Sequence, residues 1–245
     1  MPKTVALFVT CMVDQIMPEV GVAATHLLRR LGYEVAFPEA QTCCGQPFYN
    51  SGFRKEAANL ARRAIEILEP YEAVVLPGGS CAAMIRLEYA HLLADEPDWQ
   101  RRAEKLAVKT FELSQFLARE GVELRGQAAG SPITYHDSCH MCRMLGLKEE
   151  PRQVLTAVGY TIAEMAESDR CCGFGGLFSI RMPEVSNAMT ADKLRQAQET
   201  GATTIVTSDP GCLMQMRGLA EGVEVKHLAV ALEEATRRQG EGVTR

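Results

Sequence analysis

Apolar residues along the chain form short runs that alternate with longer segments of helical spacing. Residues 4–10, TVALFVT, are apolar and β-branched, which predicts a buried strand. In the segment that follows, apolar side chains recur every three or four positions up to Leu31, and Gly32 ends the pattern as a helix C-cap does. The same alternation continues to residue 120, with an extra helical insert at roughly residues 86–106. We therefore expect the order β-α-β-α-β-α-β-α in this part of the chain.

The rest of the chain repeats this order. Strands are expected in PITYHDS, YTIAEMA and TTIVTSDP, and the closing VEVKHLAVALEEA matches the pattern of VKTFELSQFLARE at residues 108–120. Strands that alternate with helices predict an α/β fold with right-handed crossovers and parallel sheets. We expect two similar Rossmann-like halves, each a parallel sheet flanked by helices, related by internal duplication.

Length and composition agree with two domains. The chain has 245 residues, of which 47% are hydrophobic, so each half can bury a core of its own. The small and polar stretch RGQAAGSP, residues 125–132, has the character of a linker. We place the first domain at residues 1–126 and the second at residues 127–245.

Eight of the nine cysteines follow one pattern twice. Each copy has a single cysteine, a Cys-Cys-Gly triplet 32 positions later, and a further single cysteine. The first copy is Cys11, Cys43, Cys44 and Cys81, and the second is Cys139, Cys171, Cys172 and Cys212. Each of these positions follows a predicted strand, and parallel sheets carry their sites at the strand ends where the strand order reverses. We therefore expect each half to gather four thiols into one crevice.

Four thiolates can bind a zinc ion or an iron-sulfur cluster. Zinc sites usually take cysteines two to four positions apart, whereas vicinal sulfurs can each reach a different iron of a cluster. The vicinal pairs therefore favour iron-sulfur, up to two clusters in the chain. Buried structural cysteines are the weaker interpretation, because chance does not explain the double spacing.

Two histidines flank the second copy only. His136 and His140 lie beside Cys139, and a histidine near a reactive centre can transfer protons or add a ligand. The matching positions of the first copy are Phe8 and Met12. We therefore name His136 and His140 as candidate catalytic residues, with ordinary hydrogen bonding at a strand end as the alternative. Cys142 has no cysteine at the matching place and is expected to be a spare thiol.

Net charge and the N-terminal sequence bear on whether the protein binds nucleic acid, is secreted or crosses a membrane. The formal net charge is -5, which gives no basic face for a phosphate backbone and makes nucleic acid an unexpected partner. We see no signal-peptide pattern at the N-terminus and no apolar stretch near the roughly 18 residues of a transmembrane segment. The expected location is cytoplasmic, where cysteine patterns indicate metal binding or catalysis more than disulfides.

Several longer motifs resemble the cysteine-rich CCG-domain family. They are FVTCMVDQIMPEVG, FPEAQTCCGQPFYNSG, PGGSCAAM, YHDSCH, RCCGFGG and SDPGCLMQ. The family includes lactate-utilisation proteins, which the chain resembles most, the iron-sulfur subunit of glycolate oxidase and the cysteine-rich subunit of heterodisulfide reductase. The resemblance implies that the eight cysteines are cluster ligands. The family's fullest motif adds a fifth cysteine, but Met84 and Gln215 stand there, so ordinary 4Fe-4S clusters are expected, with zinc in one half as the alternative.

The resemblance also implies a function. We expect an iron-sulfur electron-transfer subunit of a cytoplasmic complex that oxidises L-lactate to pyruvate, with two partner subunits of which at least one carries further iron-sulfur clusters. A thiol-disulfide reductase of the heterodisulfide type is one alternative. A zinc-stabilised binding module without a redox role is the other.

Overall fold

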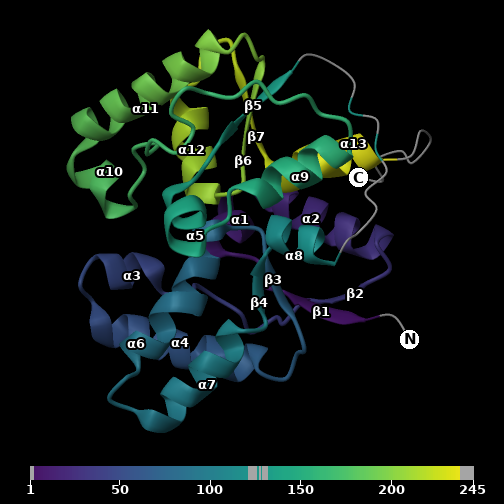
Figure 1. Ribbon diagram of the computed structural model, residues 1–245. Coiled ribbons are helices and arrows are strands. Elements are labelled where there is room, and N and C mark those ends of the chain that lie inside the picture. The colour runs from purple at the N-terminus through teal and green to yellow at the C-terminus, as the bar shows by residue number, and fades with distance from the viewer. Residues whose placement is uncertain (1–2, 121–125, 127, 129–131, 238–245) are drawn as a thin grey trace.

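The computed structural model describes residues 3–120, 126, 128 and 132–237. The first part of the chain forms a sheet of four parallel strands in the order β2-β1-β3-β4 (Figure 1). These strands are β1 (Thr4–Leu7), β2 (Glu34–Ala36), β3 (Val74–Leu76) and β4 (Thr110–Glu112). The strand order reverses between β1 and β3, which is where open parallel sheets carry their sites.

The second part forms a sheet of three parallel strands in the order β5-β6-β7. These are β5 (Ile133–His136), β6 (Thr204–Thr207) and β7 (Glu224–His227). The strand expected in YTIAEMA is reduced to a single parallel bridge between Ile133 and Ile162. The segment lies at the edge of the sheet, where Glu164 forms an ion pair with Arg152 at 2.6 Å. With that bridge in the place of β2, the two sheets have the same topology, so the α/β fold with two similar parallel-sheet halves is confirmed.

Helices cover both sheets. In the first half they are α1 (Cys11–Ile16), α2 (Pro18–Arg30), α3 (Gln46–Asn50), α4 (Arg54–Leu68), α5 (Gly79–Ala83), α6 (Tyr89–Leu92), α7 (Pro97–Ala107), α8 (Leu113–Arg119) and the π-helical turn η1 (Met84–Glu88). In the second half they are the π-helical turn η2 (His140–Leu145), α9 (Glu149–Ala157), α10 (Leu177–Arg181), α11 (Pro183–Glu199), α12 (Pro210–Leu219) and α13 (Leu228–Thr236). The insert expected at residues 86–106 is helical and comprises most of η1, α6 and α7. Within the described ranges, no helix has the length and apolar character needed to cross a membrane.

The hydrophobic core runs from one half into the other. One cluster of buried side chains contains Leu27 and Leu28 of α2 together with Leu228 and Leu232 of the C-terminal segment. A second cluster lies between β3 and the helical insert and includes Ile65 of α4. The halves are therefore packed together through apolar surface, and we expect neither to be fully stable alone.

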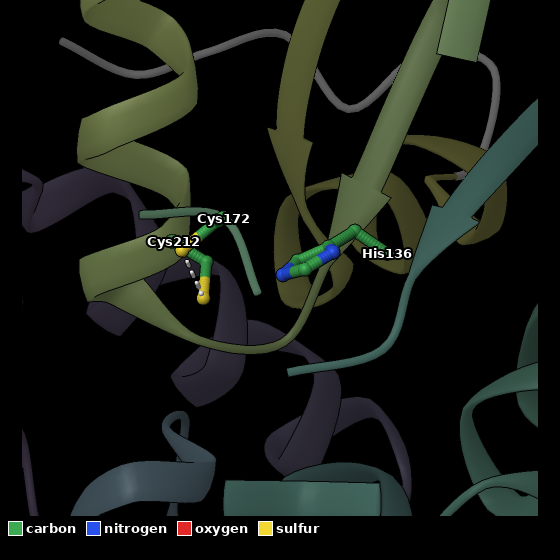
Figure 2. A group of neighbouring side chains, drawn as sticks. All are labelled: His136, Cys172 and Cys212. Carbon is green, nitrogen blue, oxygen red and sulfur yellow. Dashed lines mark hydrogen bonds between the residues drawn. The ribbon is translucent and has the colours of Figure 1, made fainter. Parts of the chain in front are cut away.

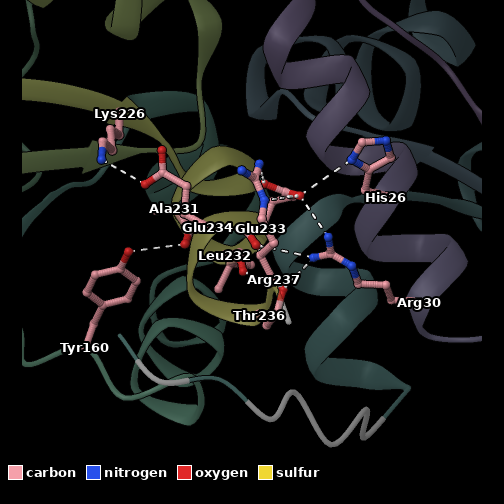
Figure 3. Close-up of polar contacts among 10 residues, drawn as sticks. All are labelled: His26, Arg30, Tyr160, Lys226, Ala231, Leu232, Glu233, Glu234, Thr236 and Arg237. Carbon is pink, nitrogen blue, oxygen red and sulfur yellow. Dashed lines mark hydrogen bonds and ion pairs between the residues drawn. The ribbon is translucent and has the colours of Figure 1, made fainter. Parts of the chain in front are cut away.

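A buried carboxylate joins α2 of the first half to α13 of the second (Figure 3). Glu233 is 4% exposed and accepts hydrogen bonds from Arg30 at 2.9 Å and from Arg237 at 2.7 Å. The Nδ1 atom of His26 lies 3.5 Å from the same carboxylate. Two guanidinium groups compensate the burial of the charge, so this contact fixes the relative position of the two helices.

The two halves also pack closely at the ends of their strands, where Gly79 of the first half contacts Met141 of the second. A Cβ atom at Gly79, the first residue of α5, would overlap the side chain of Met141 in η2. The absence of a side chain at Gly79 lets the thioether of Met141 lie against the backbone of α5. The predicted domain boundary after residue 126 falls in a stretch where residues 121–125, 127 and 129–131 lie outside the described residues, so that boundary stays a prediction.

Candidate metal and thiol site

The paired cysteines lie at the carboxyl ends of the strands, on both sides of each reversal in strand order. Cys11 begins α1 after β1, and Cys81 lies in α5 after β3. Cys139 follows β5, and Cys212 lies in α12 after β6. Each vicinal pair precedes a short helix, α3 or α10. The expectation that four thiols of each half come together therefore agrees with the backbone topology.

Seven of the eight paired cysteines, drawn from both sets, line one cavity, and Cys43 does not line it. The cavity has a volume of about 150 Å³, and side chains of both halves line it. Its cysteines are Cys11, Cys44, Cys81, Cys139, Cys171, Cys172 and Cys212. The sequence predicts one crevice in each half, whereas in the structure thiols of both halves line a common cavity, because the strand ends of the two sheets face each other.

The sulfur atoms of each half are paired closely. In the first half the Sγ atoms of Cys11 and Cys43 are 3.7 Å apart, and those of Cys44 and Cys81 are 3.2 Å apart. In the second half the Sγ atoms of Cys172 and Cys212 are 3.1 Å apart. All nine cysteines of the chain are free thiols. Thiols held this closely can share one metal ion or adjacent atoms of one cluster.

Hydrogen bonds favour the thiolate form at the first cysteine of each vicinal pair. Hydrogen bonds from Cys11, Cys44 and the Gly45 amide lower the pKa of Cys43 to about 3. Hydrogen bonds from Cys139, Cys172 and the Gly173 amide lower the pKa of Cys171 to about 2. The surrounding thiols have raised pKa values because they donate to these thiolates and are buried. The thiolate, which these hydrogen bonds favour at Cys43 and Cys171, is the form in which cysteine binds metals.

A left-handed glycine follows each vicinal pair. Gly45 has a φ of +89° and Gly173 a φ of +92°. A Cβ atom at Gly173 would overlap the carbonyl oxygen of Ser186 in α11, so this turn needs glycine for space as well as for its dihedral angle.

Buried hydroxyl groups hold the carbonyl of the second cysteine in each pair. The Tyr89 hydroxyl donates to the Cys44 carbonyl at 2.8 Å, and the Thr190 hydroxyl donates to the Cys172 carbonyl at 2.7 Å. Gln215, at the place of the family's fifth cysteine, donates to the Thr190 hydroxyl at 2.9 Å. Gln215 therefore orients the hydroxyl group that holds the second Cys-Cys-Gly triplet. Its counterpart Met84 is buried among apolar side chains.

The two candidate histidines lie in different environments. His140 lines the cavity, with its Nδ1 atom 3.7 Å from the Cys139 sulfur and its Nε2 atom 3.0 Å from the Gln46 amide of the first half. His136 is fully buried at the end of β5. Burial and the nearby Lys193 ammonium lower the pKa of His136 to about 3, so its imidazole is neutral at neutral pH. Its ring points toward the sulfurs of Cys172 and Cys212 (Figure 2).

Cys142 stays outside the group. It lies in η2, is partly exposed and does not line the cavity. Burial raises the pKa of its thiol. This agrees with its interpretation as a spare thiol.

Asp209 is a site residue that the sequence interpretation did not single out. It lines the cavity, and its carboxylate accepts from the Gly211 amide at 3.1 Å and from the Ser80 amide of the other half at 2.8 Å. The sequence does contain an indication of this residue, because an aspartate directly before a proline is typical of a helix N-cap. The bond to Ser80 could not be foreseen, because 129 positions separate the two residues.

The donor set fits a soft or borderline metal centre. Thiolates bind zinc and iron-sulfur clusters, and the sulfurs here are paired and largely buried around a common cavity. An imidazole adds a nitrogen donor that zinc and iron also accept. The nine cysteines of the chain therefore suggest that it binds a metal ion or a cluster.

Comparisons with known proteins agree with this geometry. The family model described as CCG, cysteine-rich domain, matches residues 5–86 and 133–217. Lactate utilization protein A of Shouchella clausii is 46% identical over 234 residues, which cover 93% of this chain and 98% of that protein. The protein of the same name from Bacillus subtilis is 45% identical over 234 residues, with the same coverage.

A solved structure shares the fold. The crystal structure of a hypothetical protein from Helicobacter pylori superposes with a TM-score of 0.68 at 11% identity, and the match covers 99% of this chain and 50% of that one. The two matches of the family model, each centred on one set of paired thiols, together with the identity to the Shouchella clausii and Bacillus subtilis proteins, establish that the chain belongs to the cysteine-rich CCG-domain family.

Proposed function

We propose that this chain is an electron-transfer component of a cytoplasmic complex that oxidises L-lactate to pyruvate, with iron-sulfur clusters on its two sets of four cysteines. One observation carries the proposal: thiols of both sets line one cavity in a chain 46% identical to a protein named lactate utilization protein A. The expected ligands are Cys11, Cys43, Cys44 and Cys81 for one 4Fe-4S cluster, and Cys139, Cys171, Cys172 and Cys212 for the other.

The residues of the site prepare it for this role. A cluster bound there would supply one-electron transfer. The chain contributes hydrogen bonds that favour thiolates at Cys43 and Cys171, and it buries Cys44 and Cys172, which are 1% and 2% exposed. Oxidation of lactate to pyruvate releases two electrons, so two one-electron centres at a common cavity match the reaction in number.

His140 is the candidate for proton transfer at this site. It lines the cavity, lies beside Cys139 and contacts Gln46 across the two halves. Histidine side chains commonly transfer protons at reaction centres, and His140 lies within reach of the Cys139 sulfur.

The partners we propose are two further subunits, at least one of them an iron-sulfur protein. Apolar side chains lie exposed on the short helices beside the cavity, including Phe48 of α3 and Ile180 of α10 at 40% and 75% exposure. Pro47 and Leu177 of the same helices line the cavity. Exposed apolar side chains of this kind suit a protein contact that shields the cavity.

Anaerobic purification tests the proposal directly. A brown protein that absorbs near 400 nm and holds about eight irons and eight acid-labile sulfides per chain is the expected result. A colourless protein with one or two zinc ions and no iron would reject electron transfer by this chain. Lactate oxidation by the chain with its two partner subunits, and its loss when this chain is omitted, is the corresponding activity measurement.

A further inference from the structure

We propose that His136 is a ligand of the metal centre in the second half, together with Cys172 and Cys212, so that the two halves hold chemically different centres. It replaces the four-cysteine ligand set given above for the second half with one that includes His136, and it rests on the proposed function only in requiring that a metal centre is bound there. It replaces a catalytic role for His136 with a structural one in the centre itself.

The three potential ligand atoms converge. One imidazole nitrogen of His136 and the sulfurs of Cys172 and Cys212 all lie within 4.8 Å of one another, and all three side chains are buried (Figure 2). They come from the end of β5, the CCG turn and the start of α12, so three separate elements direct them to one point. Two sulfurs and one imidazole form a ligand set that zinc and iron both accept.

Apart from the sulfurs, the imidazole has only one weak partner, the backbone carbonyl of Ser168. Neither ring nitrogen makes a hydrogen bond of ordinary geometry with a described residue, although the side chain is 0% exposed. Buried polar atoms nearly always make well-formed hydrogen bonds, so an imidazole that makes none and is aimed at two thiols indicates a missing ligand. A weak hydrogen bond to the backbone carbonyl of Ser168 raises the pKa of His136, and a carbonyl is a usual acceptor for the second N–H of a metal-bound histidine.

The charged neighbours of His136 already have partners of their own. The next residue, Asp137, accepts two hydrogen bonds of 2.9 Å from Arg152. The Lys193 ammonium donates to the carbonyls of Glu167 and Ser168 at 2.5 and 3.3 Å. Neither group is arranged to use the imidazole, which leaves the sulfurs as the groups that it faces.

The first half shows what this position looks like without a nitrogen donor. The residue three positions before Cys11 is Phe8, and it is 1% exposed and packs in one apolar cluster with Cys44 and Cys81. The duplication thus puts a phenyl ring beside one pair of sulfurs and an imidazole beside the other. The first centre has only sulfur donors, whereas the second has sulfur and nitrogen.

His136→Phe gives the second half the side chain of the first and is the decisive variant. We would prepare it in full-length protein that also carries Cys44→Ser and Cys81→Ser, so that only the second site holds metal. His140→Phe in the same background is the matched control, because His140 also lies near a cysteine. After anaerobic reconstitution, metal analysis identifies the bound metal, and X-ray absorption at the edge of that metal measures its nitrogen and sulfur neighbours.

The expected result is a nitrogen neighbour that is present in the background protein and in the His140 variant and absent in the His136 variant. A second variant, His136→Gln, and the far-UV circular dichroism of all proteins separate ligand loss from misfolding. A nitrogen signal that survives His136→Phe in folded protein, or an all-sulfur shell before any histidine is changed, would overturn the assignment while the proposed function stands. Wild-type protein that binds no metal would overturn both.

Discussion

The backbone amide of Ser80 donates a hydrogen bond of 2.8 Å to the carboxylate of Asp209, in the other half of the chain. Ser80 precedes Cys81, and Asp209 caps the helix that carries Cys212 through a bond of 3.1 Å from the Gly211 amide. One buried carboxylate therefore orders the two helix starts that present a thiol from each half. The duplicated halves are coupled at their sites as well as through their cores.

Replacement of Asp209 tests that coupling. Asp209→Ala removes the cap of α12 and leaves two amides without their acceptor, so we expect a loss of about 2–3 kcal/mol in the free energy of unfolding. Asp209→Asn keeps one acceptor oxygen and should lose less. Urea unfolding monitored by circular dichroism measures both, and equal midpoints for Asp209→Ala and wild type would contradict the coupling.

Single cysteine changes should affect the halves separately. Cys172→Ser removes a buried ligand of the second set, so we expect about half of the iron and acid-labile sulfide to be lost. Cys142→Ser serves as the control, because Cys142 does not line the cavity and its change should leave both contents unchanged. Equal losses in the two variants would show that the assignment of ligands is wrong.

Glu112 should make stability depend on pH near neutrality. Its side chain is 0% exposed, and burial raises its pKa from 4.5 to about 7. The folded protein therefore binds this proton more tightly than the unfolded chain, and stability falls as pH rises from the unfolded pKa through the folded one. Glu112→Gln does not titrate. Between pH 4.5 and 8 the unfolding free energy of wild type should fall by about 3 kcal/mol relative to that of the variant.

The check on Glu112 is urea unfolding of both proteins at pH 5 and pH 8. The difference between them should grow in favour of the variant at the higher pH. A difference that is the same at both pH values would mean that this carboxyl is not the titrating group.

Alanine at Gly173 should disrupt the second CCG turn. The backbone there has a φ of +92°, and the new Cβ atom would overlap the Ser186 carbonyl. Gly146→Ala is a matched control, since Gly146 has a φ of +70° and no atom within 4 Å of the added Cβ. We expect the control to cost about 1–2 kcal/mol from the dihedral angle alone, and Gly173→Ala to cost clearly more. Thermal unfolding compares them, and equal melting temperatures would contradict the steric argument.

Much of the fold could be predicted from local pattern. Apolar runs such as residues 4–10 define buried parallel strands, and the repeated spacing of the cysteines is enough by itself to reveal the duplication. The strand expected in YTIAEMA is much shorter in the structure than predicted. The β propensity of a segment does not show whether it has neighbouring strands on both sides. Around Ile162 the chain pairs with β5 through bonds of Thr161 and Ala163 to Ile133 and then leaves the sheet.

The shared cavity could not be predicted. It depends on how two sheets face each other, and contacts such as Arg30 with Glu233, 203 positions apart, decide this. The spacing of cysteines identifies which thiols belong to one half but contains no information about the angle between halves. The role of Phe8 as the counterpart of His136 becomes meaningful only when both rings are found beside sulfurs.

The single cavity also affects how the two thiol sets can be reached from outside. A small molecule that enters it meets sulfurs of both halves, so an alkylating reagent bulky enough to fill about 150 Å³ would block the second set as soon as it modified the first. Duplication usually doubles the number of independent binding sites. Here it gives two sets of ligands one common entrance, and access to one set consequently depends on what already occupies the other.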